Sequence, residues 1–142
     1  MTDTTDSRMD ALQTALQSVV DAAATHRPVS RDFVPIDQRS ADDLRLGVWS
    51  LVVVDEDEFA HLTGGQSDTG RLNVVAVGHI QVRDDDPGSA LESAELSMVS
   101  EIKTLVNSAL PAAICGLRLI RWRISGQLSR PYGWVTANLQ II

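Results

Sequence analysis

Two segments of the chain carry apolar residues at three- and four-residue steps, the spacing that places them along one side of an α-helix. The first helix is predicted from about Asp6 to Thr25. The second follows the run "DDDPG" at 84–88, where Asp86 is expected to cap the helix and Pro87 to stand in its first turn. The two predicted apolar stripes are Met9, Leu12, Leu16, Val19, Val20 and Ala23, and Leu91, Ala94, Met98, Ile102, Leu105, Val106 and Ala109.

Other segments are rich in β-branched residues or alternate between apolar and polar residues, and these predict strands. The clearest alternation is in the closing segment "YGWVTANLQII", where Val135 and Leu139 fall on the side opposite to Trp134. Residues 31–39 are expected to form only a short edge strand, because Pro35 lacks the N–H that a central strand needs. The remaining predicted strands are 44–54, its antiparallel partner 71–83, and 117–125.

The segment that joins the two central strands, residues 55–70, has the sequence "DEDEFAHLTGGQSDTG". It is too long for a tight hairpin turn and is rich in acidic residues and glycine, so a flexible arm is expected. Phe59 and Leu62 are its large apolar residues, and they are expected to anchor the arm on a partner.

The order of these elements is helix, short strand, two long strands, helix, two strands. Runs of antiparallel strands flanked by helices are typical of an α+β fold rather than of parallel βαβ units. We therefore predict a mainly antiparallel β-sheet with two amphipathic helices packed on one face and a long β-hairpin arm. With 142 residues, 44% of them hydrophobic, the chain is expected to fold as a single domain that spans residues 1–142.

Composition disfavours several classes of function. The chain has 12 basic and 19 acidic residues and a net charge of -7, which disfavours general nucleic-acid binding because that depends on clustered Lys and Arg. No apolar run approaches the roughly 20 residues that span a bilayer, and Met1 is not followed by the basic and apolar regions of a signal peptide. Cys115 is the single cysteine, so an internal disulfide is excluded and folding in a reducing cytoplasm is expected.

The candidate chemical motifs are incomplete. Asp84, Asp86, Glu92 and Glu95 approach the spacing of a calcium loop, but Ser89 stands where that loop needs glycine. Helix capping explains this acidic cluster more simply. The three histidines lack metal-ligand spacing, "GGQSDTG" lacks the Lys-Ser or Lys-Thr of a phosphate-binding loop, and no nucleophile elbow is present. We therefore expect no metal, no cofactor and no enzymatic activity.

The strand that contains Trp49 has apolar residues on both faces, so two explanations stay open. Trp49 either fills the core together with Trp122 or lies in a contact with a partner subunit. On the strand of Trp122, simple alternation places Arg118 on the same side as this residue, and Arg121 and Arg123 on the other side. The arginines are therefore expected to bracket the sheet, where an acidic loop of an adjacent copy could contact either side.

The segment "VAVGHIQVRDDDPGSALESAELSMVSEIKTLV", the strand pattern "L.L..W.I" after it and a terminal strand entered through Pro131 together resemble the tail terminator proteins of long-tailed bacteriophages. These are also called minor tail or tail completion proteins. The resemblance covers nearly the whole chain, including the amphipathic first helix and the long-armed hairpin. Members of the family typically form a hexameric ring that stops polymerisation of the tail tube at full length and offers its other face to the head.

The resemblance implies a structural virion protein at the head-proximal end of the tail, assembled in the host cytoplasm. It implies a homo-oligomer, expected as a hexameric ring, that contacts the tail tube protein and the head-tail connector protein. DNA could pass through this ring without sequence-specific binding, and no membrane is involved. The residues predicted for a subunit or tube interface are Trp49, Phe59, Leu62, Arg121, Arg123, Tyr132 and Trp134.

Other functions fit the same sequence. A head-tail connector, or neck, protein of the same virion would also be a small ring-forming α+β protein, and its location in the particle would separate it from a terminator. A cytosolic ligand-binding module is the third interpretation, which a monomer holding a small molecule in its core would favour. An enzyme is the least favoured class, because no catalytic motif supports it.

Overall fold

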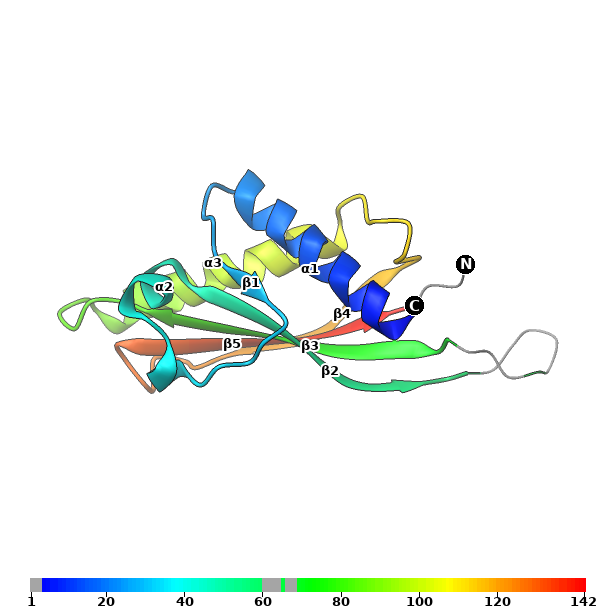
Figure 1. Ribbon diagram of the computed structural model, residues 1–142. Coiled ribbons are helices and arrows are strands. Elements are labelled where there is room, and N and C mark those ends of the chain that lie inside the picture. The colour runs from blue at the N-terminus through cyan, green and yellow to red at the C-terminus, as the bar shows by residue number, and fades with distance from the viewer. Residues whose placement is uncertain (1–3, 60–64, 66–68) are drawn as a thin grey trace.

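The computed structural model of the protein describes residues 4–59, 65 and 69–142. Five strands form one sheet in the order β1-β2-β3-β5-β4, and helices α1 and α3 lie over one of its faces (Figure 1). Among the described strands, only β1 and β2 pair in parallel. The predicted α+β class, with a mainly antiparallel sheet and two helices on one face, is therefore confirmed. The elements are α1 Thr5–Ala22, β1 Val29–Ser30, η1 Ile36–Gln38, α2 Ala41–Leu46, β2 Val48–Asp57, β3 Arg71–Gln81, α3 Gly88–Val106, β4 Leu117–Ile124 and β5 Tyr132–Ile141.

The two long helices begin differently. At the start of α1, Thr4 caps the helix because its Oγ1 accepts a hydrogen bond of 3.0 Å from the Ser7 N–H. At the start of α3, the prediction of Asp86 as the cap is wrong. Its carboxylate accepts a hydrogen bond of 3.0 Å from the Arg83 N–H instead, and Pro87 occupies the capping position without a side-chain bond to the helix.

The buried faces of these helices follow the predicted apolar stripes over most of their length. Ala23 and Ala109 are exceptions, because both stand beyond the last turn of their helix and are exposed. Two acidic residues of α3, Glu95 and Glu101, are buried among the apolar ones. The completely buried stripe residues are Met9, Leu12, Leu16 and Val20 in α1, and Leu91, Met98, Ile102 and Leu105 in α3.

Two predicted strand positions are wrong. Residues 31–39 do not form an edge strand: the short strand β1 precedes them, and Pro35 leads into η1. Residues 44–46 belong to α2, because the Ser40 hydroxyl accepts a hydrogen bond from the helix backbone and so starts a helix despite the β-forming residues that follow. Gly47 then turns the chain into β2 with a φ of 89°, a left-handed value that favours glycine.

The core lies between the helices and the sheet. In β5 the predicted alternation is confirmed, since Val135 and alternate residues after it are buried under the helices while Trp134 projects from the other face. Trp49 is completely buried, and Gly78 on the neighbouring strand leaves space for it. A Cβ atom at Gly78 would lie 3.1 Å from the Trp49 ring and 2.7 Å from the Met98 methyl group. Trp49 is therefore a core residue, and its predicted place in an exposed interface is wrong.

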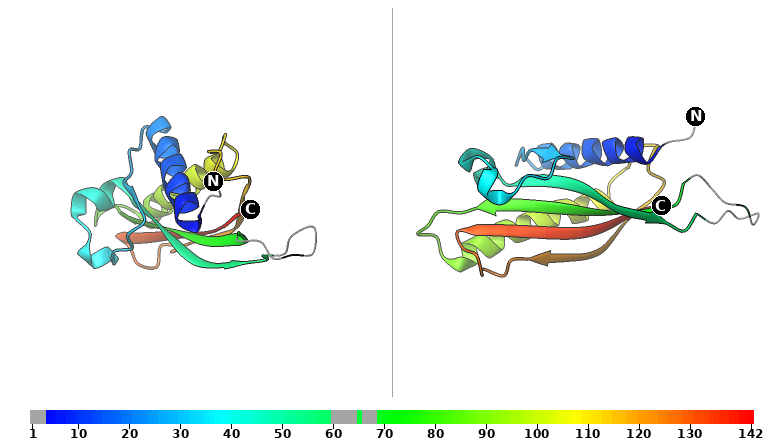
Figure 2. Two further views of the ribbon diagram at one scale, coloured as in Figure 1. Left: turned by 45° about the vertical axis from the view of Figure 1, so that its right-hand side comes forward. Right: turned by 60° about the horizontal axis from the view of Figure 1, so that its bottom comes forward.

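The hairpin of β2 and β3 reaches beyond the helices at one end of the molecule (Figure 2). The first part of the predicted arm, residues 55–57, is strand in β2. Residues 60–64 and 66–68, and with them the predicted anchor Leu62, lie outside the described residues. The flexibility expected for the arm therefore stays a prediction.

Candidate functional site

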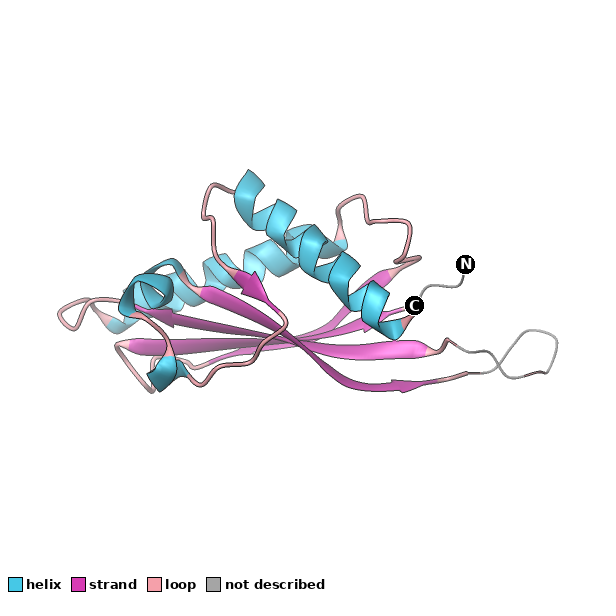
Figure 3. Ribbon diagram, viewed as in Figure 1, coloured by secondary structure: helices cyan, strands magenta, loops and turns pink. Residues whose placement is uncertain are grey.

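The helices cover one face of the sheet, and we call the opposite face the open face (Figure 3). Tyr132 and Trp134 project onto it from the start of β5, with Tyr132 43% exposed and Trp134 half-buried. Sheet faces in contact with solvent are usually polar. Two aromatic residues at one end of the open face are instead typical of a surface that contacts another protein.

The segment between β1 and α2 covers part of the open face, and η1 lies beneath the sheet in Figure 1. The Phe33 ring packs against the His79 ring at a centroid distance of 5.8 Å, and Arg39 Nη2 donates a hydrogen bond of 2.7 Å to Ser50 Oγ. Burial lowers the pKa of His79 below its usual value, and the positive charge of Arg39 lowers this pKa further. This segment therefore covers the face around Ser50 of β2 and His79 of β3, while the rest of these strands and β5 and β4 stay open.

Three exposed arginines extend the open face to the edge of the sheet, and we call them the arginine stripe. Residues directly opposite each other in an antiparallel pair project from the same face, and all three lie opposite polar residues of the open face. Successive members are about 7 Å apart along the strand. None of them forms an ion pair with another of the described residues. The opposed pairs are Arg118 with Gln140, Arg121 with Asn138 and Arg123 with Thr136.

A β-bulge produces this arrangement. The register of β4 against β5 shifts between Leu119 and Arg121, which leaves Ile120 as an extra residue without a partner. The extra residue reverses the alternation of faces beyond it, so Arg118 lies on the same face as Arg121 rather than on the face of Trp122. The predicted bracketing of the sheet by arginines is therefore wrong.

The structure brings some of the predicted interface residues together and separates others. Phe59 lies just after β2, half-buried against Gly70, at the opposite end of the sheet from Tyr132. Trp49 is on the helix-covered face, and Leu62 is outside the described residues. The residues that share the open face are Arg121, Arg123, Tyr132 and Trp134.

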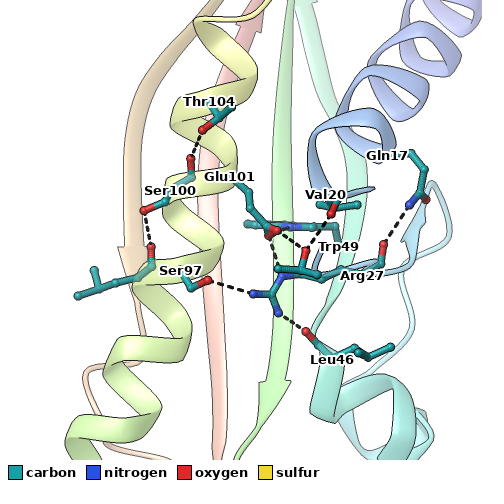
Figure 4. A network of polar contacts seen from close by, with 11 residues as sticks. Gln17, Val20, Arg27, Leu46, Trp49, Ser97, Ser100, Glu101 and Thr104 are labelled. Atoms are coloured by element: carbon teal, nitrogen blue, oxygen red, sulfur yellow. Dashed lines mark hydrogen bonds and ion pairs between the residues drawn. The ribbon is translucent and has the colours of Figure 1, made fainter. Parts of the chain in front are cut away.

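The helix-covered side contains a buried polar network that the sequence patterns did not indicate (Figure 4). Glu101 of α3 accepts hydrogen bonds from Arg27 Nε at 2.7 Å, from Trp49 Nε1 at 3.2 Å and from Thr25 Oγ1 at 2.7 Å. Arg27 and Glu101 are both buried. The signal for this network was Glu101 itself, an acidic residue that stands between apolar residues of the predicted α3 stripe.

Arg27 connects the same network to two further elements. Its Nη2 donates to Ser97 Oγ at 3.2 Å, and its Nη1 donates to the carbonyl oxygen of Leu46 at the end of α2. Charge-assisted hydrogen bonds of this kind are shorter and stronger than neutral ones. The network therefore holds α2, α3 and the connection after α1 in one arrangement.

Glu95, one helical turn and a half before Glu101, fixes the other side of α3. One of its carboxylate oxygens accepts hydrogen bonds from Ser125 Oγ at 2.6 Å, from the Ser125 N–H at 3.0 Å and from the Trp134 N–H at 3.1 Å. The residue is completely buried. It thus positions the connection between β4 and β5, and with it the backbone that carries Trp134.

A third buried contact joins α1 to the base of the hairpin. Glu56 accepts hydrogen bonds of 2.7 Å from the Gly70 N–H and from Arg8 Nη2. The bond from Gly70, followed by those from Thr5 and Arg8, lowers the pKa of Glu56 below its usual value of 4.5. The base of the hairpin is therefore ordered by its own contacts.

A groove of about 850 Å³ lies between α1 and α3, on the side away from the sheet. Its walls are mostly small side chains, among them Ala15, Ser18 and Ala22 from α1 and Ser97 and Ser100 from α3. Small side chains leave space between the helices, and the sequence patterns did not indicate this groove because they identify buried faces rather than the distance between two elements.

Neither a metal site nor a membrane span is found in the described part of the chain. No group of three His, Cys, Asp or Glu residues there is placed to hold a metal ion. No helix among the described residues is long and apolar enough to cross a membrane.

Comparisons with models of known protein families and with curated protein sequences find no match to the chain.

Proposed function

We propose that this protein is a structural virion protein of a long-tailed bacteriophage, a tail terminator whose ring caps the tail tube. The ring ends polymerisation of the tube and provides the surface for head attachment. In this proposal the partners are further copies of the same chain, in a ring expected to be hexameric, the tail tube protein and the head-tail connector protein. The protein acts at the head-proximal end of the tail after assembly in the host cytoplasm.

The observation that carries the proposal is the open face with its aromatic residues and arginine stripe. A chain that acts alone has little reason to leave Tyr132, Trp134 and three arginines with no ion pair among the described residues on one side of a sheet. Aromatic residues and arginine are the residue types that contribute most to protein–protein contacts. A structural protein that must bind identical copies and a tube needs such surfaces.

The buried networks support the same role. Glu95 holds the backbone of Trp134 from beneath, and the Arg27–Glu101 pair holds the helices over the sheet. Both networks make the open face rigid before any partner binds, which lowers the entropy that is lost on assembly. Both oxygens of Glu101 and one oxygen of Glu95 accept hydrogen bonds from structural donors.

The experiment that tests the proposal is tail length in the phage that encodes the protein. Removal of the protein should give over-long or headless tails in electron micrographs, and wild-type protein supplied in trans should restore tails of one length. A variant with Tyr132→Ser and Trp134→Ser should fail to restore them, while Asp21→Ala, an exposed position of α1 over the opposite face of the sheet, should succeed. Tails of normal length and heads joined to them without the protein would contradict the proposal.

The same geometry serves a head-tail connector of that virion, which is the alternative function. Gold-labelled antibody on isolated particles separates the two, because a terminator stands on the last tube ring and a connector stands on the head. A tail assembled in the absence of heads should carry a terminator and lack a connector.

The groove between α1 and α3 favours a ligand-binding module as a further candidate. Pockets of about 300 to 1,000 Å³ are the usual size for small-molecule sites. Native mass spectrometry of the purified protein should then show a bound small molecule, and filling the groove with Ala22→Leu should remove it. A clean mass for the unliganded chain would contradict this candidate.

A further inference from the structure

The two flanks of the molecule differ in charge. On one flank α3 packs over β5 and β4, and the charged side chains along β4 are the three members of the arginine stripe. Lys103 of α3 adds to them, with its Nζ lying 5.7 Å from the centre of the Trp122 ring of β4. In a chain with a net charge of -7, this basic flank is a local exception.

The opposite flank, formed by α1, β1 and β2, is acidic. Asp55 and Asp57 are exposed on β2 beyond the part that pairs with β1. On α1, the exposed Asp6 and Asp10 share one positive partner, since Arg31 Nη1 lies 2.8 Å and 2.9 Å from their carboxylates. Arg8 and Arg31 pair with Glu56, Asp6 and Asp10, and Arg71 of β3 lies opposite Asp57, so this flank still carries more acidic than basic side chains.

Each flank also exposes one aliphatic side chain at a bulge. In β4 the bulge residue Ile120 is 51% exposed, and in β2 the register shift between Val53 and Asp55 leaves Val54 unpaired and 61% exposed. Each side chain stands directly beside the charged residues of its flank. Val54 and Ile120 border one hollow of the open face, so an apolar side chain lies beside acidic residues at one rim of this hollow and beside basic residues at the other.

We propose that the two flanks bind each other between copies of this chain. The arginine stripe and Ile120 of one copy contact Asp55, Asp57 and Val54 of the next copy. Because two different surfaces meet, the contact is head-to-tail and repeats around a closed ring. The inference rests on the proposed function in one respect: the ring is the assembly expected of a tail terminator.

The geometry favours a second copy over other partners. β2 and β4 run in opposite directions, so a copy related by rotation about an axis along the strands places the two edges antiparallel. The bulges at Val54 and Ile120 interrupt the regular row of backbone donors and acceptors at both edges, so the contact is made by side chains rather than by strand addition. Nucleic acid is the less favoured occupant of the stripe, because the net charge of the whole chain repels phosphate.

The test uses charge reversal on the full chain, with assembly size measured by sedimentation velocity and light scattering at low salt. The basic-flank variant carries Arg121→Glu and Arg123→Glu, and the acidic-flank variant carries Asp55→Arg and Asp57→Arg. Each variant alone should remain monomeric at concentrations where the wild type forms its ring, because like charges then face each other. Wild-type rings should also weaken as the Debye length falls from about 10 Å at 0.1 M salt to about 3 Å at 1 M.

Mixing the two variants provides the decisive measurement. In a one-to-one mixture every contact again joins a basic flank to an acidic one, so particles of the wild-type size should return with alternating copies. Matched controls reverse two exposed charges outside both flanks, with Arg45→Glu and Arg83→Glu for the first variant and Asp84→Arg and Asp85→Arg for the second. These controls should assemble as the wild type does, and far-UV circular dichroism should confirm that all variants fold.

Several outcomes would overturn the inference. Wild-type assembly by both flank variants would mean that the ring uses other surfaces. The terminator function would then still be tested separately, by the tail-length experiment. A basic-flank variant that keeps its ring but loses retention of duplex DNA would assign the stripe to nucleic acid. A wild-type chain that stays monomeric at all concentrations, or a mixture that stays monomeric, would contradict pairing of the flanks. Normal tails without the protein would contradict the terminator function and leave flank pairing, as measured in solution, standing.

Discussion

Replacement of Arg27 by methionine is expected to destabilise the protein strongly, because it removes one partner of a buried ion pair. Arg27 Nε lies 2.7 Å from Glu101, and the two side chains are only 6% and 5% exposed. Without Arg27, the Glu101 carboxylate keeps two donors, Trp49 Nε1 and Thr25 Oγ1, but no positive charge. Breaking a buried pair in this way costs about 3 to 5 kcal/mol, a large fraction of the roughly 5 to 15 kcal/mol that stabilises a typical domain.

The double variant separates the ion pair from its surroundings. Glu101→Leu alone should also cost about 3 to 5 kcal/mol, since it leaves the Arg27 guanidinium buried without a carboxylate. Arg27→Met with Glu101→Leu removes both charges and leaves Trp49 Nε1 unpaired, which costs about 1 to 3 kcal/mol, while Thr25 Oγ1 keeps its hydrogen bond of 3.2 Å to the Val20 carbonyl oxygen. The double variant should therefore be more stable than either single variant, with a coupling energy of several kcal/mol between the two positions.

Urea titration monitored by tryptophan fluorescence measures these differences as shifts of the midpoint at constant slope. The control is Arg31→Ala, which breaks an exposed pair with Asp6 and Asp10 and should cost about 0 to 1 kcal/mol. If Arg27→Met costs no more than this control, or if the Arg27 and Glu101 effects simply add, the network does not stabilise the fold through its buried charge.

Three further predictions concern the core and the titrating groups. Leu105→Ala should cost about 2 to 5 kcal/mol in urea titration, because Leu105 is completely buried, whereas the exposed Lys103→Ala should cost under about 1 kcal/mol. The folded-state pKa of Glu56 is lowered, so its contribution to stability is present above pH 4.5 and is lost as the pH falls through the folded pKa. Glu56→Gln should accordingly flatten the decline of the melting temperature below pH 4.5, and an unchanged acid limb would contradict this cause. Phe33→Ala should expose His79 and raise its pKa towards 6.5 in a proton NMR titration, and no movement would mean that Phe33 does not supply the burial.

Long periodic segments were predictable from the sequence, because one physical requirement acts on many residues at once. The stripe from Met9 to Val20 and the alternation from Val135 to Ile141 each bury at least four side chains against the same core, so a single exception changes little. The α+β class follows from the order of those segments. The short elements were not predictable in this way, since a single cap at Ser40 overrides the β-forming residues after it.

The candidate surface was only partly predictable for a similar reason. Trp134 was placed correctly on the face opposite to Val135 because β5 pairs without interruption against β3. The arginines were misplaced because a bulge has no signature in simple alternation, and one extra residue reverses every face beyond it. Trp49 was left between two explanations, because its burial under α3 depends on Glu101. This residue is 52 positions away in the chain, so it has no effect on the local sequence pattern around Trp49.

The bulge at Ile120 has a consequence for how this protein can change over time. Deletion of that one residue would remove the bulge and leave all three arginines on the open face, because Arg118, Arg121 and Arg123 would then alternate regularly with Leu119 and Trp122. A substitution at Ile120 leaves the faces as they are. Related chains should therefore tolerate both a gap and many residue types at position 120, while the arginines on either side keep their partners in β5.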